Sequence, residues 1–212
     1  MIKKIDLNIS AKERNDIIAR ENHKLFKEYG LRVFNLISSP GSGKTTLLEK
    51  LADKLKERLV VIVGDLATTK DADRIKKHGS QAVQIETGGG CHLNAEMVRD
   101  AFHKIKTDNA KLLIIENVGN LVCPAAYELG EDAKIAMLSL PEGDDKPIKY
   151  PSLFLRADLV ILSKIDLAPI MDFNLEQAKS DCLKLNSKAT IMEVSSKTGT
   201  GLDDLTHYLI GS

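Results

Sequence analysis

A glycine-rich segment, residues 38–46, constrains the fold of this chain more than any other feature, and it reads SSPGSGKTT. It follows an apolar run at residues 32–37 and precedes residues 45–56, where apolar side chains recur at helical spacing. A strand, a tight glycine turn and a helix in direct succession aim several backbone amides at one point, beside the positive end of the helix dipole. The sequence therefore predicts a phosphate-binding loop.

Residues that are predicted to bind a nucleotide in this loop are Gly41, Ser42, Gly43, Lys44, Thr45 and Thr46. The glycines let the backbone curl around phosphate oxygens, Lys44 neutralises their charge, and the Thr45 hydroxyl is placed to hold Mg²⁺. Ser38 replaces the first glycine of the usual G-x-x-x-x-G-K-[ST] pattern, which removes some backbone freedom. Phosphate binding is still expected, because Gly43 and Lys44 approach the charge most closely.

Apolar runs alternate with charged segments of helical period along the rest of the chain. Strands are predicted at residues 32–37, 59–63, 82–86, 112–118, 135–140, 159–163 and 190–194. Helices are predicted at residues 11–28, 45–56, 72–78, 93–106, 175–185 and 202–209. Asp71, Asp73 and Arg74 are interpreted as the charged start of the third helix. The predicted fold class is α/β: a three-layer P-loop NTPase with a mostly parallel, about seven-stranded sheet covered by helices on both faces.

Two later segments predict that the nucleotide carries guanine. An apolar run ends at Ser163, and the carboxylate of Asp166 can then accept hydrogen bonds from guanine N1 and the 2-amino group, which adenine cannot offer. The stem of Lys164 is expected to lie over the base plane. Ser163 stands where asparagine is usual, so the local match is incomplete. Ser196 and Lys197, after the last strand, resemble the element that closes over guanine.

Glu116 and Gly119 are predicted to sense the γ-phosphate, the first by ordering the Mg²⁺ shell and the second through its amide. Asp65 is a second candidate for Mg²⁺, because it follows the carboxyl end of a parallel strand. Its alternative role is to cap the turn before the next helix. The candidate catalytic residues are Lys44, Asp65 and Glu116. No glutamine or arginine is obviously placed to assist, so slow hydrolysis is predicted in the absence of a partner.

Cys91, His92 and Cys123 form a candidate site for nickel or zinc, the metals that suit thiolate and imidazole ligands. Both loops follow carboxyl ends of parallel strands, so they are expected at the same sheet edge as the phosphate loop. Cys91 is expected at a helix N-terminus, whose dipole stabilises a thiolate. Three ligands underfill a closed site, so a two-fold dimer sharing one or two ions is expected. The alternative is that these cysteines and the histidine only pack and hydrogen-bond.

Thirty basic residues balance thirty acidic ones, which speaks against a nucleic-acid or membrane-surface partner. No segment is long and apolar enough to span a bilayer, and no apolar run follows the N-terminal lysines, so a cytoplasmic protein is expected. Three cysteines are an odd number, which argues against a disulfide framework, and Cys182 is interpreted as a packing residue.

One main domain is predicted for the 212 residues. Residues 31–212 are expected to form the P-loop GTPase domain, and residues 1–30 a helical segment that packs on this domain or lies at a subunit contact. Ser10 and Glu13 predict a capping box at the start of that helix, and Gly30 is placed to end it.

Two other functions remain open from the residues alone. A P-loop kinase for a small molecule would prefer ATP, and Asp166 speaks against it. A signalling-type GTPase with a structural zinc site would unfold when the metal is chelated.

The order of SPGSGKT, GDL, GGGCHL, IENVGNLVCP, PEGDDK, SKID and SSK resembles the HypB family, SIMIBI-class P-loop GTPases that help to insert nickel into [NiFe] hydrogenase. The resemblance runs from about Leu31 to the C-terminus, and ENVGNLVCP together with CHL is its most specific part. The related urease GTPase uses a Cys-Pro-His metal motif, which this chain lacks.

The resemblance implies a homodimer that responds to GTP and GDP, with nickel or zinc held between the subunits by Cys91, His92 and Cys123. It implies two partners, a small nickel-binding hydrogenase accessory protein and the hydrogenase large subunit, with urease maturation proteins served in some organisms. The acidic turn at residues 142–146 would border the nucleotide or the subunit contact. The cysteine motif and histidine-rich stretch that extend some members are missing from this sequence, so a storage role is not expected.

Overall fold

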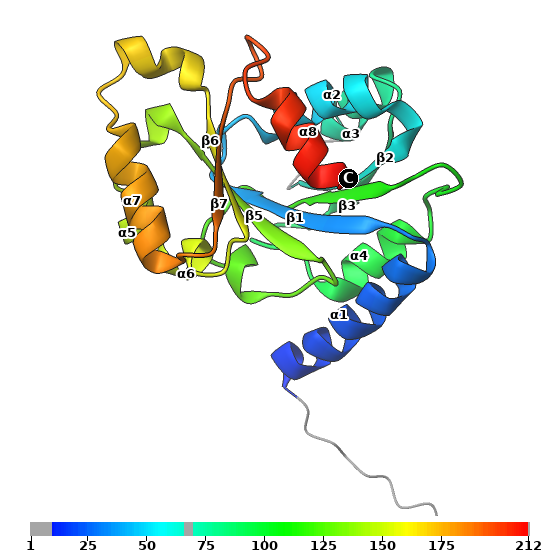
Figure 1. Ribbon diagram of the computed structural model, residues 1–212. Coiled ribbons are helices and arrows are strands. Elements are labelled where there is room, and N and C mark those ends of the chain that lie inside the picture. The colour runs from blue at the N-terminus through cyan, green and yellow to red at the C-terminus, as the bar shows by residue number, and fades with distance from the viewer. Residues whose placement is uncertain (1–9, 66–69, 212) are drawn as a thin grey trace, which may run out of the picture.

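A seven-stranded sheet in the order β3-β2-β4-β1-β5-β6-β7 forms the centre of the molecule (Figure 1). The structure is a computed structural model that describes residues 10–65 and 70–211, with the backbone alone at Asp65. All the paired strands run parallel. The strands are β1 (Arg32–Ser38), β2 (Leu59–Asp65), β3 (Gln81–Glu86), β4 (Leu112–Glu116), β5 (Ala133–Ser139), β6 (Leu159–Ser163) and β7 (Thr190–Val194).

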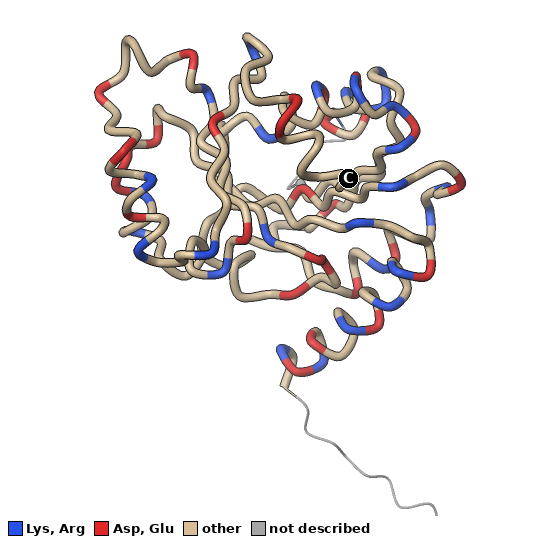
Figure 2. Tube along the Cα trace, in the orientation of Figure 1, with Lys and Arg blue, Asp and Glu red and all other residues tan. Residues whose placement is uncertain are grey.

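Helices cover both faces of this sheet, as predicted (Figure 1). The α-helices are α1 (Ala11–Glu28), α2 (Lys44–Leu55), α3 (Lys70–Lys77), α4 (Ala95–Phe102), α5 (Lys146–Lys149), α6 (Pro151–Phe154), α7 (Leu175–Leu185) and α8 (Leu202–Ile210). Short 3₁₀ turns are η1 (Lys56–Arg58), η2 (Pro124–Ala126), η3 (Leu140–Glu142) and η4 (Ile165–Ile170). The predicted fold class is confirmed, and residues with basic and acidic side chains are mixed along the helices (Figure 2).

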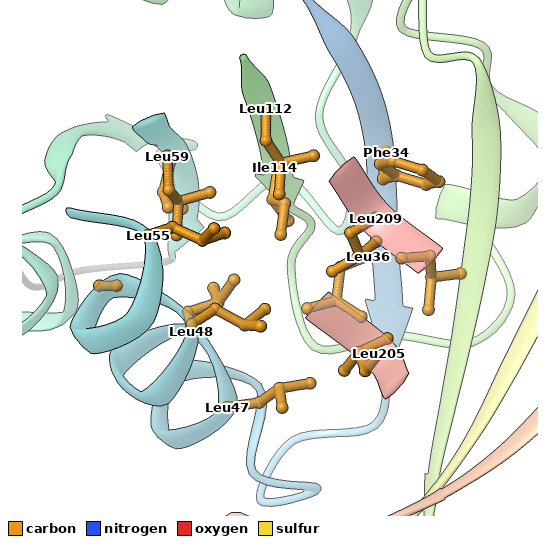
Figure 3. Packing of buried hydrophobic residues seen from close by; sticks show 14 of the residues in the cluster. Phe34, Leu36, Leu47, Leu48, Leu55, Leu59, Leu112, Ile114, Leu205 and Leu209 are labelled. Atoms are coloured by element: carbon orange, nitrogen blue, oxygen red, sulfur yellow. The ribbon is translucent and has the colours of Figure 1, made fainter. Parts of the chain in front are cut away.

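The strands are apolar on both faces because helices bury both sides of a parallel sheet. In β1, Phe34 and Leu36 face the layer of α2, α3 and α8, whereas Val33 and Ile37 face the opposite layer. Figure 3 shows the first layer, in which Leu47 and other side chains of α2 and α8 pack against strand residues. The loops that follow the carboxyl ends of the strands lie beyond this core, at one edge of the sheet.

The structure differs from the predicted helices in the bounds of the fourth helix and in two additional short helices. The fourth helix was expected at residues 93–106, but α4 begins at Ala95, where the Asn94 side chain accepts a hydrogen bond from the Met97 amide and caps the helix. The helices α5 and α6 are missing from the prediction, since four residues are too few to show a helical period. Cys91 therefore lies in a loop before the helix, not at its N-terminus.

Helix α1 begins as predicted, with a capping box in which the Glu13 amide donates to Ser10 Oγ over 3.2 Å and the Ser10 amide donates to Glu13 Oε2 over 2.8 Å. Gly30 follows the helix with a φ of 66°, which favours glycine. The helix packs against α4. A contact with a second subunit stays a prediction. Within the described residues, no helix is long and apolar enough to cross a membrane.

Replacing Asn22 by alanine is expected to destabilise the attachment of α1. Asn22 is fully buried, donates to the carbonyls of Ala95 and Leu129 over 2.7 and 3.0 Å, and accepts from Arg99 Nε over 2.8 Å. The variant leaves two buried carbonyls with one partner fewer, which costs about 1–3 kcal/mol of unfolding free energy. Urea denaturation measures this loss. The exposed Arg20→Ala on the same helix should change stability by less than about 0.5 kcal/mol, and equal effects of both variants would contradict the assignment.

Candidate nucleotide and metal sites

A cavity of about 480 Å³ opens at the carboxyl ends of the central strands and contains the phosphate loop. Proteins with parallel sheets bind their ligands at this edge, because the loops that follow the strands meet there. The predicted nucleotide residues that line it are Gly41, Gly43, Lys44, Thr45, Thr46, Glu116, Gly119 and Lys164. The structure thus brings together residues that lie at or after the ends of β1, β4 and β6 and are far apart in the sequence.

The phosphate loop has the backbone that its glycines predict, with φ of 76° at Gly41 and 101° at Gly43. Lys44 Nζ donates to Ser38 Oγ over 2.7 Å, so the hydroxyl that replaces the usual glycine holds the lysine at the cavity wall. Ser42 is buried, and its side chain lies against Ser38 at 2.5 Å.

Ser163, the unusual residue before the predicted guanine element, donates from Oγ to the carbonyl of Ser42 over 3.1 Å. In the sequence this serine stands where asparagine is usual and makes the match to the guanine element incomplete. The structure uses the hydroxyl to tie β6 to the phosphate loop.

Thr45 and Glu116 lie together in the cavity, and Thr45 Oγ1 donates to Glu116 Oε1 over 3.1 Å. A hydroxyl and a carboxylate oxygen side by side in a phosphate cavity are the ligand types that Mg²⁺ takes in proteins. The donor set therefore fits a magnesium ion between α2 and β4. Asp65 is the last residue of β2, and its side chain lies outside the described part of the chain, so its magnesium role stays a prediction.

Gly119 lies directly against the phosphate loop. A Cβ atom at this position would be 2.9 Å from Pro40 Cγ and 3.0 Å from the Pro40 nitrogen. Real Cβ atoms do not approach other heavy atoms so closely. Glycine is thus required here by the contact, and the segment after β4 cannot move without disturbing the phosphate loop.

The two predicted guanine elements meet beside the cavity. Ser195, which is fully buried, donates from Oγ to Asp166 Oδ1 over 2.6 Å and so joins η4 to the loop that carries Ser196 and Lys197. Lys164 has a φ of 60° and donates from Nζ to the Gly41 carbonyl over 2.7 Å. Asp166, Ser196 and Lys197 are not among the residues that line the 480 Å³ cavity, and their contact with a base stays a prediction.

Cys91, His92 and Cys123 come together in one chain, with their ligand atoms within 4.8 Å of one another. Cys91 lies between β3 and α4, and Cys123 directly precedes η2. Cys91 Sγ is 3.4 Å from His92 Nδ1. The His92 ring lies on the Tyr127 ring, with 4.0 Å between the centroids, which fixes its orientation. The cluster is a three-ligand site that is open to solvent at Cys91.

The protonation of these ligands differs from the expectation for Cys91. A hydrogen bond with the Cys123 thiol, followed by desolvation, raises the pKa of Cys91, and the α4 dipole that was expected to lower it begins only at Ala95. Burial lowers the pKa of His92, so its imidazole is neutral and can bind a metal near pH 7. A metal must therefore displace thiol protons to bind.

Cys182 is a packing residue, as interpreted from the sequence. It is fully buried in the cluster between the sheet and α7, and this burial raises the pKa of its thiol to about 12. Reactive cysteines have a lowered thiol pKa, so Cys182 is not one of them. It can therefore serve as a control cysteine in mutagenesis.

Sequence reasoning did not place six of the lining residues at the cavity: Pro40, Gly64, Asn117, Val118, Asp71 and Arg74. The last two, Asp71 and Arg74, were interpreted as a charged helix start. They do lie in the first turns of α3, but Arg74 also donates to Glu49 Oε1 over 2.7 Å, and this hydrogen bond raises the pKa of the guanidinium. A charged helix start looks the same in sequence whether it faces solvent or a ligand. Only the packing of α3 beside α2 distinguishes the two cases.

The acidic turn at residues 142–146 is held by its own contacts. Glu142 Oε1 accepts from the Ser139 hydroxyl over 2.7 Å, and Asp144 Oδ2 accepts from the Asn174 amide over 2.9 Å. Its predicted place at the nucleotide or the subunit contact stays a prediction.

Comparison with known proteins gives one consistent relationship. Residues 32–193 match the model of the CobW/HypB/UreG nucleotide-binding domain. The chain is 47% identical over 215 residues to the hydrogenase/urease maturation factor HypB of Helicobacter pylori strain ATCC 700392 / 26695, an alignment that covers 99% of this chain and 89% of the relative.

Two solved structures have the same fold. The crystal structure of HypB from Helicobacter pylori in complex with nickel matches with a TM-score of 0.90 and 48% identity, covering 93% of this chain and 94% of that one. The crystal structure of the hydrogenase maturation factor HypB from Archaeoglobus fulgidus matches with a TM-score of 0.85 and 35% identity, covering 92% and 97%. The extent of these matches and the sites described above agree, and the chain belongs to the HypB family within the CobW/HypB/UreG nucleotide-binding domains.

Proposed function

We propose that this protein is a GTP-hydrolysing nickel metallochaperone for the maturation of [NiFe] hydrogenase. The observation that carries the proposal is the short connection between two sites. Glu116 lies in the phosphate cavity, and the same segment continues to Cys123 in the three-ligand cluster. The relationship to hydrogenase/urease maturation factors and to a nickel-complexed HypB structure supports nickel as the cargo.

The residues of the cavity divide the work of hydrolysis among them. Lys44 moves its ammonium group from Ser38 to the phosphates, where it balances the charge that develops on the transferred group. Thr45, Glu116 and Asp65 hold Mg²⁺, which supplies further charge neutralisation when bound. The Gly119 amide reads the γ-phosphate from beside Pro40. Arg74 is held by Glu49 and Asp71, so slow intrinsic hydrolysis is expected.

An open cluster suits a cargo site better than a structural one. Cys91 is exposed, and three ligands leave one position of a tetrahedral site for water, for a partner or for a second subunit. We infer a homodimer that shares nickel or zinc at this surface and forms in response to GTP. A small nickel-binding accessory protein, the hydrogenase large subunit and, in some organisms, urease maturation proteins are the inferred partners.

A cytoplasmic location follows from the same chemistry. Cys91 and Cys123 lie within hydrogen-bonding reach of each other as free thiols, and a reducing compartment keeps such thiols reduced. The proposed function needs both sulfurs as metal ligands.

The Cys123→Ala variant should abolish the release of nickel that GTP triggers in the wild-type protein. Loss of one thiolate removes both a ligand and the part of the site that is joined to Glu116. Nickel transfer to a chromogenic chelator, recorded before and after addition of GTP, measures the effect. The matched control is Cys182→Ala, which removes a buried thiol outside the cluster and should release nickel as the wild type does.

Guanine nucleotide binding must be intact in both variants for this comparison. Identical release from Cys123→Ala and the wild type would refute the assigned ligand set. Unfolding of the wild type on chelation, without nickel exchange, would instead favour a signalling-type GTPase with structural zinc.

The Asp166→Asn variant should prefer xanthine nucleotides to guanine nucleotides. The Asp166 carboxylate is predicted to accept hydrogen bonds from guanine N1 and from the 2-amino group. In the asparagine variant the side-chain amide would place its NH₂ group opposite one of these donors, so that hydrogen bond is lost. Xanthine has an oxygen in place of the 2-amino group, and this oxygen can accept from the NH₂ group. Loss of a hydrogen bond to a charged group costs about 1.5–3 kcal/mol, so GDP should bind about tenfold to a hundredfold more weakly. Competition between GDP and XDP measures the change. The amide oxygen can still accept from Ser195, which keeps the loop in place. Unchanged GDP affinity would exclude Asp166 as the base reader.

The association state should depend on the nucleotide. A non-hydrolysable GTP analogue should shift the protein toward dimers and GDP toward monomers, because the γ-phosphate contact at Gly119 displaces the segment that leads to the shared metal. Analytical ultracentrifugation of nickel-loaded protein measures the shift. Equal association constants with both nucleotides would remove GTP-responsive dimerisation from the proposal.

A further inference from the structure

The side chain of Asn117 connects the phosphate cavity with the turn that carries Cys91 and His92. Asn117 directly follows Glu116, lines the cavity and is 1% exposed. Its Oδ1 atom accepts from the Leu93 amide over 3.1 Å and from the Val118 amide over 3.0 Å. Leu93 is the neighbour of His92 in sequence, so one hydrogen bond spans the two candidate sites.

The orientation of Asn117 is determined by its partners. Backbone amides can only donate, so the oxygen of the Asn117 side chain must face Leu93. Its Nδ2 donates to Asn35 Oδ1 over 3.1 Å, and Asn35 Nδ2 donates in turn to Glu131 Oε1 over 3.0 Å. A carboxylate without a proton can only accept, which fixes the direction of the whole chain of bonds. Asn117 thus has one arrangement in which all its buried partners are satisfied.

The turn that receives this bond is itself firmly seated. Leu93 is fully buried, and a Cβ atom added to Gly64 on β2 would be 2.8 Å from its side chain. At the other end of the turn, Asn120 Nδ2 donates to the Cys91 carbonyl over 3.4 Å. Two asparagines of the segment after β4 therefore hold both ends of the Cys91–His92 turn, while Cys123 is part of the same segment.

We propose that Asn117 is a positioning residue that carries the nucleotide state to the Cys91 and His92 half of the metal site. This inference rests on the function proposed above and adds a second connection to it. A change at Gly119 moves Cys123 through the chain, and the hydrogen bond from Leu93 makes His92 follow. Cys123 and the Cys91–His92 turn then move together. Without the hydrogen bond from Leu93, the backbone connection after Gly119 would move only Cys123.

The test compares nickel affinity in two nucleotide states for four proteins: wild type, Asn117→Ala, Asn35→Ala and Asn120→Ala. Each is titrated with nickel against a competing chelator in GDP and in a non-hydrolysable GTP analogue. The charge-transfer absorption band between thiolate and nickel shows directly whether Cys91 and Cys123 bind the metal. The wild-type affinities should differ by about 5-fold to 150-fold between the nucleotides, as for ordinary coupled sites. In Asn117→Ala the ratio should fall toward one when each nucleotide is added at a concentration that saturates the variant, since Asn117 also lines the cavity.

Asn35→Ala is the matched control, because it breaks the same buried amide pair but leaves an acceptor for Leu93. It should keep the wild-type ratio, and Asn120→Ala should reduce it. An undiminished ratio in folded Asn117→Ala overturns the proposal, as does an equal loss in Asn35→Ala. If Asn117→Ala does not fold, an unchanged ratio in the half-buried Asn120→Ala overturns it. A wild-type ratio of one would instead refute the proposed function itself.

Discussion

The hydrogen bond from Thr45 Oγ1 to Glu116 Oε1, 3.1 Å long, is the interaction on which the arrangement of both sites depends. It joins the first turn of α2 to the end of β4, the strand between β2 and β1 in the sheet. The segment that leaves β4 at this point passes Pro40 at Gly119 and reaches Cys123. Thr45 and Glu116 thus lie at the start of the segment that leads to Cys123.

Hydrogen bonds between buried side-chain amides fix the arrangement of the loops at this edge of the sheet. Asn35 and Asn117 are 0% and 1% exposed, on strands or strand ends that are otherwise apolar. Burying such groups is unfavourable unless every donor and acceptor is paired, and here Glu131 and the Leu93 amide complete the pairing. A fully paired network permits one arrangement of the loops, which is what a site built from separate segments requires.

The candidate metal cluster of Cys91, His92 and Cys123 has features that suit exchange better than permanent binding. Cys91 is exposed and the pKa of its thiol is raised by the hydrogen bond with Cys123, so a metal ion that binds there has to displace a proton. The neutral imidazole of His92, held against Tyr127, is the ligand that needs no such exchange. These properties agree with the function proposed above, in which the site has to release its metal.

The sequence by itself determined the parts of this protein that depend on neighbouring residues. The phosphate loop, the capping box at Ser10 and the seven strands are visible there because a strand, turn or cap is specified by a few adjacent side chains. The bounds of α1 and α7 agree with the prediction for the same reason.

Only the tertiary structure decided how distant segments combine. It placed Cys91 outside α4, turned Arg74 toward the nucleotide cavity, and gave Asn117 its partner Leu93. None of these has a local signature, because an asparagine or an arginine reads the same in sequence whichever segment packs beside it. The parallel sheet brings the loops to one edge, and the pairing of buried polar groups selects which of them touch.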